Sequence, residues 1–564
     1  MGSFASEEVQ VQVRSHLLGK RYLIVLDNLQ LDNWGDIRGC FPEHNNGSCI
    51  LVTTTHFDRY VFNGLKIYIH SMTLLDPNES WDLFCRTLSK GSMSRSPELE
   101  KIRGNIIEIC DGLPLTIVVV AKRLSKCNDV LKKWEKIKKE IESLGILDRN
   151  TLIFHYNKLS QILKVCFLYL GVFPKRKEIQ VKNLIGLWIA EGYFEPLEFE
   201  KKESQGYPYL QELIERRLVL ICNQNSNGKI KTCRMHSAMH SFCVGEAQKE
   251  GIFCAVNTLQ HSGLPLSDFA NSSRWLSLCK HSFDYYVLFS SNKPRSIFFF
   301  DEDPKTFVPF KLLRVLAFVP SPFLQRVSMH LGDLIFLRYL FISKRFEGLG
   351  NILSKTPNLQ TLIVSSDEPQ IGAPTIHLPS TIWKLPQLRH LELGDMYTMD
   401  PPCTVKAKLQ TLSWVSPTHC GMEVFPNLRK LKIFYKDDLE FNRTHGSSSN
   451  PIILENFGYL KQLQRLKISV SVSCAVVYTE RFMCPLQLQK LSLSGMNLSK
   501  RDLTVIGMLP ELKVLKLENA FLERVWEVVE GGFRELRFLL VKDKNLLQFL
   551  ADEKSFKHLE RLVL

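Results

Sequence analysis

The second half of the chain repeats one hydrophobic pattern. A leucine is followed three and five positions later by further apolar residues, as in Leu313, Leu316 and Phe318. The first leucines of eleven such copies are Leu313, Leu337, Leu359, Leu388, Leu409, Leu428, Leu463, Leu488, Leu512, Leu536 and Leu559. Alternating apolar residues predict a short strand in each copy. One copy cannot cover its own apolar row, so neighbouring copies must stack into a solenoid.

Most steps between these leucines fit the period of leucine-rich repeats, although the step from Leu428 to Leu463 is longer. That step predicts an inserted loop over 435–450. The repeats also continue to Leu564 without a polar capping repeat, so we expect the chain to be incomplete at this end or to end in an unusual way. The variable strand positions should face outward on the concave side and contact a protein partner. They are His390, Glu392, Lys432, Lys467 and Lys516. Their basic character favours an acidic partner, and a merely solvated face is the alternative.

The first half opens with two short apolar runs that read as parallel strands. Residues 21–27 (RYLIVLD) end in Asp27, and residues 49–55 (CILVTTT) end in hydroxyl side chains. Continuous apolar runs are typical of parallel strands buried on both faces. Ligands bind at the carboxyl ends of such strands, so Asp27 is a candidate Mg²⁺ ligand.

Composition narrows the class of protein. The 564 residues are 45% hydrophobic and 23% charged, which is typical of globular proteins. Lys and Arg exceed Asp and Glu by 72 − 58 = 14, which favours acidic partners. No apolar run approaches the ~20 residues of a membrane span, and no secretory signal opens the chain. The fifteen scattered cysteines indicate reduced thiols in a cytoplasmic protein.

Six phrases follow one another along the first half of the chain: KRYLIVLDN (20–28), GSCILVTTT (47–55), SWDLFCRTL (80–88), GLPL (112–115), CFLYLGVFPKRKEIQVKNLIGLWIAEGYF (166–194) and RMHS (234–237). In this order they resemble the plant NB-ARC leucine-rich-repeat disease resistance proteins. The resemblance is to their coiled-coil branch and its late-blight-resistance-like group, and it covers essentially the whole chain.

The resemblance implies a multidomain α/β + α architecture with five parts. A partial P-loop NTPase α/β sheet that lacks the P-loop itself spans 1–90, and a helical ARC1 segment spans 91–150. A winged-helix ARC2 domain spans 151–255, a junction or solenoid cap spans 256–305, and the leucine-rich repeats span 306–564.

The resemblance also implies an ADP/ATP site with Mg²⁺. The nucleotide-binding residues would be Asp27, Thr53, Thr54, Gly112, Leu113, Pro114, Leu115 and His236. Asp27 would hold Mg²⁺ and the two threonines would lie near the terminal phosphate. The GLPL residues would pack against adenine and ribose, and His236 would reach the β-phosphate of ADP.

Four departures from the family pattern weaken that site. No G-x-x-x-x-G-K-[ST] phosphate loop is present, so the sequence resembles a receptor truncated at its N-terminal side. Asn28 replaces the second acidic residue of the strand and cannot act as a base, so no catalytic residue is assigned. Thr55 replaces an arginine and Ser237 replaces an aspartate. We therefore expect nucleotide binding to be weak or lost, with at most a vestigial ATPase.

Two functions follow. The first is a disease resistance receptor whose nucleotide switch is coupled to repeats that recognise a pathogen effector or a guarded host protein, triggering defence and the hypersensitive response. The second is a nucleotide-free receptor fragment that acts as a decoy or regulator, for example on other immune receptors. Nucleic acid is not an expected partner. The expected location is the cytoplasm, with the nucleus or a peripheral membrane site as alternatives.

Two further patterns left alternatives open. Cys233, His236, His240 and Cys243 have a spacing that could hold zinc, but two core thiols beside a family motif are the favoured interpretation. Met1, Gly2 and Ser6 match the myristoylation pattern, the basis of the membrane alternative.

Overall fold

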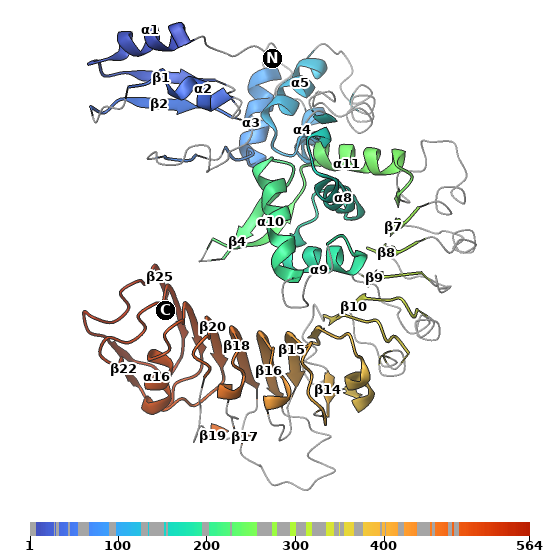
Figure 1. Ribbon diagram of the computed structural model, residues 1–564, viewed down its shortest axis with the longest axis vertical. Coiled ribbons are helices and arrows are strands. Elements are labelled where there is room, and N and C mark those ends of the chain that lie inside the picture. Colours follow the sequence, from blue (N-terminus) through green and yellow to red (C-terminus); the bar gives the residue numbers. More distant parts are fainter. Residues whose placement is uncertain are drawn as a thin grey trace.

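The structure is a computed structural model in which a helical first half continues into a curved array of parallel strands (Figure 1). It describes the chain except residues 1–6, 28, 30–32, 43–45, 55–66, 71, 89–96, 126–133, 135–151, 154–155, 195–201, 226–227, 256–272, 279–293, 301–311, 319–333, 343–348, 350–352, 354, 366–375, 395–396, 401, 416–421, 437–451, 454–456, 472–476 and 479–483. The predictions about Asn28, Thr55, the myristoylation pattern and most of the 435–450 insertion lie outside the described residues.

The first unit is a two-stranded parallel sheet. It comprises α1 (Glu7–Leu17), β1 (Leu23–Leu26), α2 (Trp34–Arg38) and β2 (Cys49–Val52). Trp34 of α2 is buried against Leu26 and Ile50, so one face of the sheet is covered. On the other face Leu23 is 71% exposed and Leu51 is 56% exposed. The two predicted strands are present, but the prediction that both faces are buried is wrong, because the described helices cover only one of them.

Three helices follow the sheet and share a core of their own. They are α3 (Pro77–Leu88), α4 (Pro97–Cys110) and α5 (Pro114–Leu124). Phe84, Ile106 and Val120 are almost completely buried between them. The turn from α4 into α5 contains the GLPL residues, so these residues are held between two packed helices.

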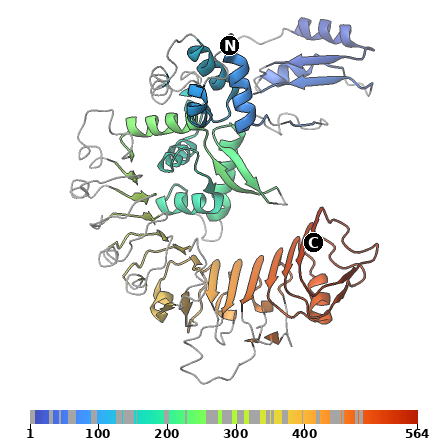
Figure 2. The ribbon, with the colours of Figure 1, turned by 180° about the vertical axis from the view of Figure 1, so that it is seen from behind.

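A winged helix occupies the next part of the chain. Its elements are α8 (Gln161–Tyr169), the 3₁₀ turn η3 (Leu170–Val172), β3 (Ile179–Gln180), α9 (Val181–Glu191), α10 (Lys202–Glu215), β4 (Leu220–Gln224), β5 (Ile230–Arg234) and α11 (Ser237–Lys249). β5 lies between β3 and β4 in an antiparallel sheet. The hairpin of β4 and β5 extends from the body of the winged helix toward the far arm of the repeat array (Figure 2).

The repeats form one continuous parallel sheet. Its inner strands are β6 (Phe253–Ala255), β7 (Trp275–Leu278), β8 (Ser296–Phe299), β9 (Val315–Phe318), β10 (Tyr339–Ile342), β11 (Thr361–Val364), β13 (His390–Glu392), β15 (Thr411–Val415), β16 (Lys430–Lys436), β18 (Arg465–Ser471), β20 (Lys490–Ser494), β21 (Val514–Glu518), β23 (Phe538–Lys542) and β25 (Arg561–Val563). Short outer elements lie between them: β12 (Ile376–Leu378), β14 (Tyr397–Met399), β17 (Ile452–Ile453), β19 (Val477–Tyr478), β22 (Val525–Glu527), β24 (Gln548–Leu550), η8 (Ser380–Lys384), η9 (Met422–Val424), η10 (Phe457–Tyr459) and α16 (Lys500–Gly507).

The leucine pattern sets the register of this sheet. The second leucines of the eleven predicted copies stand opposite one another from strand to strand: Leu316, Leu340, Leu362, Leu391, Leu412, Leu431, Leu466, Leu491, Leu515, Leu539 and Leu562. All but the last are at most 1% exposed. The predicted solenoid is therefore present, with one strand for each copy, and its leucine column forms the core.

The parallel sheet begins earlier than the leucine pattern indicated. β7 and β8 lie within the segment 256–305, which was predicted as a junction or cap, and β6 directly precedes it. The described strands of this segment therefore belong to the repeat sheet. Ser273 and Pro294 stand where the leading leucine would be, three residues before Leu276 and Ile297. The repeated phrase is therefore broken there, although the strands are kept.

The winged helix covers the concave side of these first repeats. Phe298 and Tyr339 are buried in one core together with Trp188 of α9. Gly186 lets α9 approach closely, because a Cβ at this position would lie 3.2 Å from the Tyr339 ring. Covering by α9 explains why the variable strand positions are apolar here and polar farther along the array.

An arginine column marks the edge of this interface. It consists of Arg274, Arg295, Arg314 and Arg338, each directly preceding a repeat strand. The backbone N–H of each of the last three donates to the carbonyl oxygen of the one before, at 2.7, 2.7 and 2.8 Å. Two of the side chains also donate to the end of α9, Arg314 to the Glu191 carbonyl at 2.5 Å and Arg338 to the Ala190 carbonyl at 3.3 Å. Cations at a helix C-terminus bind its unpaired carbonyl groups favourably.

The Glu191 side chain completes the contact. It is 6% exposed, it accepts a hydrogen bond from Ser296, and Ser296 is also bonded to Tyr169. Burial raises the pKa of Glu191, while the Ser296 hydrogen bond and nearby arginines act in the opposite direction. Polar groups from the winged helix and from the repeats thus satisfy one another inside a shared core.

Candidate functional site

The carboxyl ends of β1 and β2 bring two predicted site residues together. Thr53 Oγ1 donates to Asp27 Oδ1 at 2.5 Å, and Thr53 N donates to the Leu26 carbonyl at 2.9 Å. Parallel pairing aligns the two strand ends, so a carboxylate and a hydroxyl meet at one edge. Such oxygen atoms are the ligands that Mg²⁺ prefers.

The GLPL turn is held in a fixed conformation. Asp111 and Gly112 have φ values of +46° and +74°, and the Gly112 carbonyl accepts from Leu75 N at 3.0 Å. Pro114 begins α5 and is exposed, and Leu115 is 54% exposed. Proline needs no hydrogen-bond partner for its nitrogen, so these two residues present an apolar surface beside the turn.

Asp111, directly before this turn, joins it to the winged helix. Its side chain is 3% exposed, and Arg234 Nη1 lies 3.0 Å from Oδ2 and 3.2 Å from Oδ1. Arg176 Nε lies 3.2 Å from Oδ1. The backbone N–H and the hydroxyl of Ser237 both donate to Oδ2 at 3.1 Å. Four donors from the winged helix therefore converge on one buried carboxylate.

His236 lies beside this carboxylate with one ring nitrogen unused. Its Nδ1 accepts from Ala238 N at 3.2 Å, so the proton belongs on Nε2. Nε2 is buried and lies 3.9 Å from Asp111 Oδ2, and it makes no hydrogen bond of ordinary geometry with the described residues. Burial and Arg234 lower the pKa of His236, whereas the Asp111 carboxylate and the nearby backbone carbonyls of Cys110 and Asp111 act in the opposite direction. A neutral imidazole with a buried, unused N–H fits an oxygen acceptor such as a phosphate.

The start of α11 carries Ser237 where the family pattern has an aspartate. The N-cap is His236, because its imidazole accepts from the backbone of Ala238. A carboxylate is still present at this helix start, because Asp111 from the GLPL turn accepts from the Ser237 backbone. A negative charge there interacts favourably with the helix dipole.

The zinc alternative does not agree with the geometry. Cys243 Sγ donates to the Phe167 carbonyl at 3.2 Å, and His240 Nε2 contacts the Phe173 carbonyl at 2.6 Å. Cys233 is buried in β5 opposite Ile179. The described part of the chain contains no group of three or more side chains arranged to hold a metal ion.

The predicted concave face is partly occupied by the protein itself. Glu392 Oε2 accepts from Lys182 Nζ of α9 at 2.8 Å and lies 3.8 Å from Lys432 Nζ. Lys430 Nζ lies 3.3 Å from Oε1 of the same carboxylate. Burial would raise the pKa of Glu392, but these three lysines lower it to about 2. Glu392 and Lys432 are thus engaged within the chain, and Lys467 and Lys516 lie farther along the array.

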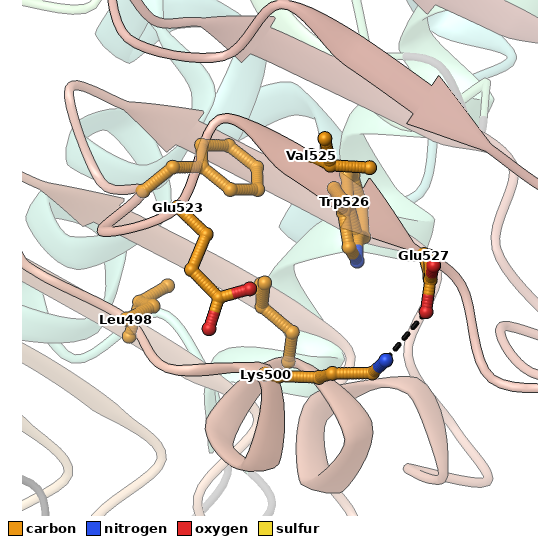
Figure 3. A pocket seen from close by; sticks show the side chains of 8 residues that line it. Leu498, Lys500, Glu523, Val525, Trp526 and Glu527 are labelled. Carbon is orange, nitrogen blue, oxygen red and sulfur yellow. Dashed lines mark hydrogen bonds and ion pairs between the residues drawn. The ribbon is translucent and has the colours of Figure 1, made fainter.

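A small pocket lies near the end of the array, between α16 and β22 (Figure 3). Lys500 and Glu527 form an ion pair across it, and Leu498 and Trp526 line its walls. None of the predicted nucleotide-binding residues lines it.

Three family models match the chain in the order of its folded parts. The "NB-ARC domain" matches residues 1–94, the "Disease resistance protein Winged helix domain" matches 172–243, and the "Leucine-rich repeat region" matches 293–501. Late blight resistance protein R1-A of Solanum demissum is 29% identical over 99% of this chain. Two putative late blight resistance protein homologs from the same plant are 29% and 30% identical over 99% of it.

The chain belongs to the NB-ARC leucine-rich-repeat family of plant disease resistance proteins. It spans 44% of the length of R1-A, and 44% and 45% of the lengths of the two putative homologs. As a member of this family it carries recognisable NB-ARC, winged-helix and repeat regions. The first eight of the eleven leucine copies fall within the matched repeat region, and the RMHS phrase falls within the matched winged helix. Within the described ranges no helix is long and apolar enough to cross a membrane.

The sequence analysis missed three residues of the contact between the GLPL turn and the winged helix. Asp111, Arg176 and Arg234 were not predicted as site residues. The signal for Asp111 was modest: an acidic residue directly before the glycine of the GLPL turn. Arg234 lies at the start of the RMHS phrase, but nothing in the sequence indicates that 123 positions are bridged by one ion pair.

Proposed function

We propose that the chain acts as a plant immune receptor inside the cell, in which a nucleotide-gated joint controls a repeat array that senses a pathogen effector or a guarded host protein. Recognition would release the joint and trigger defence, including the hypersensitive response. The relatives named as late blight resistance proteins support this role. The observation that carries the nucleotide part is the unused, buried Nε2 of His236 beside the GLPL turn.

The residues at the joint fit ADP in part. His236 would donate to a phosphate oxygen, and the apolar surface of Pro114 and Leu115 would lie against adenine and ribose, together with Gly112 and Leu113. At the sheet edge Asp27 would hold Mg²⁺, and Thr53 and Thr54 would lie near the terminal phosphate. Bound nucleotide would supply the phosphate charges that link these two groups of residues.

A second function is favoured by the Asp111 contacts. They already join the GLPL turn to the winged helix through protein groups alone. A chain held closed in this way needs no nucleotide and would act as a protein-binding decoy or regulator through its repeats.

One experiment separates the two functions. The full chain is purified and denatured, and released nucleotide is measured by ion-exchange chromatography. For the receptor we expect close to one ADP per chain, a several-fold lower content in His236→Ala, and no change in His558→Ala, an exposed histidine in the repeats. If the protein carries no ADP and added ADP does not raise its melting temperature, the nucleotide-gated joint is contradicted and the second function is supported.

A further inference from the structure

Six cations from two domains gather where the winged-helix hairpin faces the repeat array. Arg465 and Lys490 stand opposite each other on β18 and β20. Lys467 and Lys516 both stand opposite Ser492 of β20, one from each neighbouring strand. Period-two alternation places all four on the concave face. Lys229 and Lys231 belong to the hairpin. We refer to these residues as the facing cluster: Lys229, Lys231, Arg465, Lys467, Lys490 and Lys516.

The two sides of the facing cluster are close enough to affect one another. Burial lowers the pKa of Lys229, and Arg465 lowers it further. Burial also lowers the pKa of Lys490 to about 8, with Lys516, Arg465 and Lys231 acting in the same direction. Like charges from the winged helix and the repeats therefore oppose each other across the intervening space.

Carboxylates do not neutralise this cluster. Among the described residues none of the six forms an ion pair, and three of their charged groups contact aromatic rings instead. Lys467 lies 5.7 Å from the Phe434 ring centre, Lys516 lies 5.6 Å from that of Phe538, and Lys229 lies 5.2 Å from that of Tyr207. Glu518 is the only acidic residue in β18, β20 and β21. The lysines near β13 differ in this respect, because Lys182, Lys430 and Lys432 share the Glu392 carboxylate.

We propose that the facing cluster binds a small polyanion with several phosphate groups, which joins the β4–β5 hairpin to the concave face of β18, β20 and β21. A phosphate concentrates charge on three strong acceptor oxygens, and lysine and arginine bind such groups with charge-assisted hydrogen bonds. The hydroxyls of Ser492 and Ser494, at alternate positions of β20, offer further donors. This site does not depend on nucleotide at the GLPL turn.

An acidic protein segment fits the geometry less well. An extended chain carries at most one carboxylate charge every ~3.3 Å and spreads these charges along its length. The facing cluster instead occupies a short stretch of three strands, and the β4–β5 hairpin supplies its other two lysines from the opposite side. A compact ligand reaches both sides at once, and it offsets the repulsion between them.

Isothermal titration of the full chain with tripolyphosphate tests the proposal, with orthophosphate, ADP and an octa-aspartate peptide as comparisons. Two double variants remove one side each: Lys229→Gln with Lys231→Gln, and Lys467→Gln with Lys490→Gln. Each removes two charge-assisted hydrogen bonds, so each should weaken tripolyphosphate binding at least tenfold. Lys557→Gln, at an exposed lysine before β25, serves as the matched control and should bind as the parent does.

Each other outcome contradicts the proposal. Tripolyphosphate binding that persists in both double variants places the anion elsewhere. Binding weakened equally by Lys557→Gln reflects net charge alone, and competition by ADP places the anion at the nucleotide site. Tighter binding of octa-aspartate identifies an acidic protein segment as the ligand. Melting temperatures of all variants, measured without ligand, show whether each has folded, and the single variants Lys231→Gln and Lys490→Gln replace a double variant that has not.

Discussion

Lys182 Nζ donates a hydrogen bond to Glu392 Oε2 at 2.8 Å, although 210 positions separate the two residues. This pair joins the start of α9 to β13, at the point where the winged helix stops covering the concave face. Lys182 is half-exposed, whereas the Glu392 side chain is only 13% exposed. The buried Glu392 carboxylate therefore needs its lysine partners to stay charged, whereas the half-exposed Lys182 is also solvated by water.

Replacing Glu392 by Gln should destabilise the contact between winged helix and repeats more than Lys182→Ala does. The first change leaves Lys430 and Lys432 without their carboxylate, whereas the second leaves Glu392 two partners. Because Lys182 is exposed to solvent, the coupling energy in a double-mutant cycle should be only about 1 kcal/mol. Melting temperatures and hydrogen exchange in α9 measure the effect. Glu530→Gln, which breaks the exposed pair with Lys554, is the control and should change neither quantity. Equal effects of the two single changes would contradict this account.

Asp111→Asn should weaken the joint between the GLPL turn and the winged helix. The substitution keeps the shape but removes the charge that Arg234 and Arg176 share, and breaking a buried pair from one side costs about 3 kcal/mol or more. We expect a lower melting temperature and faster exchange at the Ser237 amide. Asp82→Asn, at an exposed position of α3, provides the comparison. Unchanged exchange at Ser237 would show that the carboxylate does not hold the helix start.

The contrast between the leucine column and Asp111 shows what the sequence could predict. A strand in each repeat follows from local alternation and from the need to bury each leucine, and both are visible in any one copy. The Asp111 and Lys182 contacts depend on how separately folded parts meet, and no local pattern encodes that. The first repeats were missed for a related reason. Trp275 and Phe298 face the winged helix rather than solvent, so the polar positions that mark a repeat strand are lost there.

Gly112→Ala should unfold or strongly destabilise the helical unit. Gly112 has φ +74°, and a Cβ there would lie 2.4 Å from the Leu75 carbonyl oxygen, which belongs to the backbone and cannot move aside cheaply. Strain of this kind costs upwards of about 2 kcal/mol. Gly104→Ala is the matched control, because no atom lies within 4 Å of its Cβ position in α4. Alanine favours helices, so this control should stabilise by about 0.5–1 kcal/mol. Thermal unfolding measures both changes, and a neutral Gly112→Ala would contradict the geometry of the turn.

The winged helix should lose stability in mild acid because of His240. Burial lowers the pKa of this histidine from 6.5 to about 4, and the Phe173 carbonyl acts in the opposite direction. Between these values the unfolded chain binds a proton that the folded chain does not, so stability falls as the pH drops from about 6.5 toward 4. The full loss is about 3 kcal/mol at 1.36 kcal/mol for each pH unit. Burial lowers the pKa of His236 as well, which adds to the loss in the same direction.

His240→Gln should reduce this acid sensitivity, because its amide can still donate to the Phe173 carbonyl but does not titrate. Melting temperatures from pH 7 to 4.5 measure the difference. His558→Gln, at an exposed position, should leave the pH profile of the parent unchanged. A His240→Gln profile parallel to that of the parent would assign the acid sensitivity to other groups.

The arginine column joins the end of α9 rigidly to the first repeats. Arg314 and Arg338 donate hydrogen bonds to the last carbonyls of α9, and backbone hydrogen bonds between neighbouring repeats hold the two arginines in place. A twist of the solenoid would therefore rotate α9, because no flexible hinge separates the two at this point of the described chain. Torque on the array would thus reach the winged helix, whose contact with the GLPL turn runs through the Asp111 carboxylate.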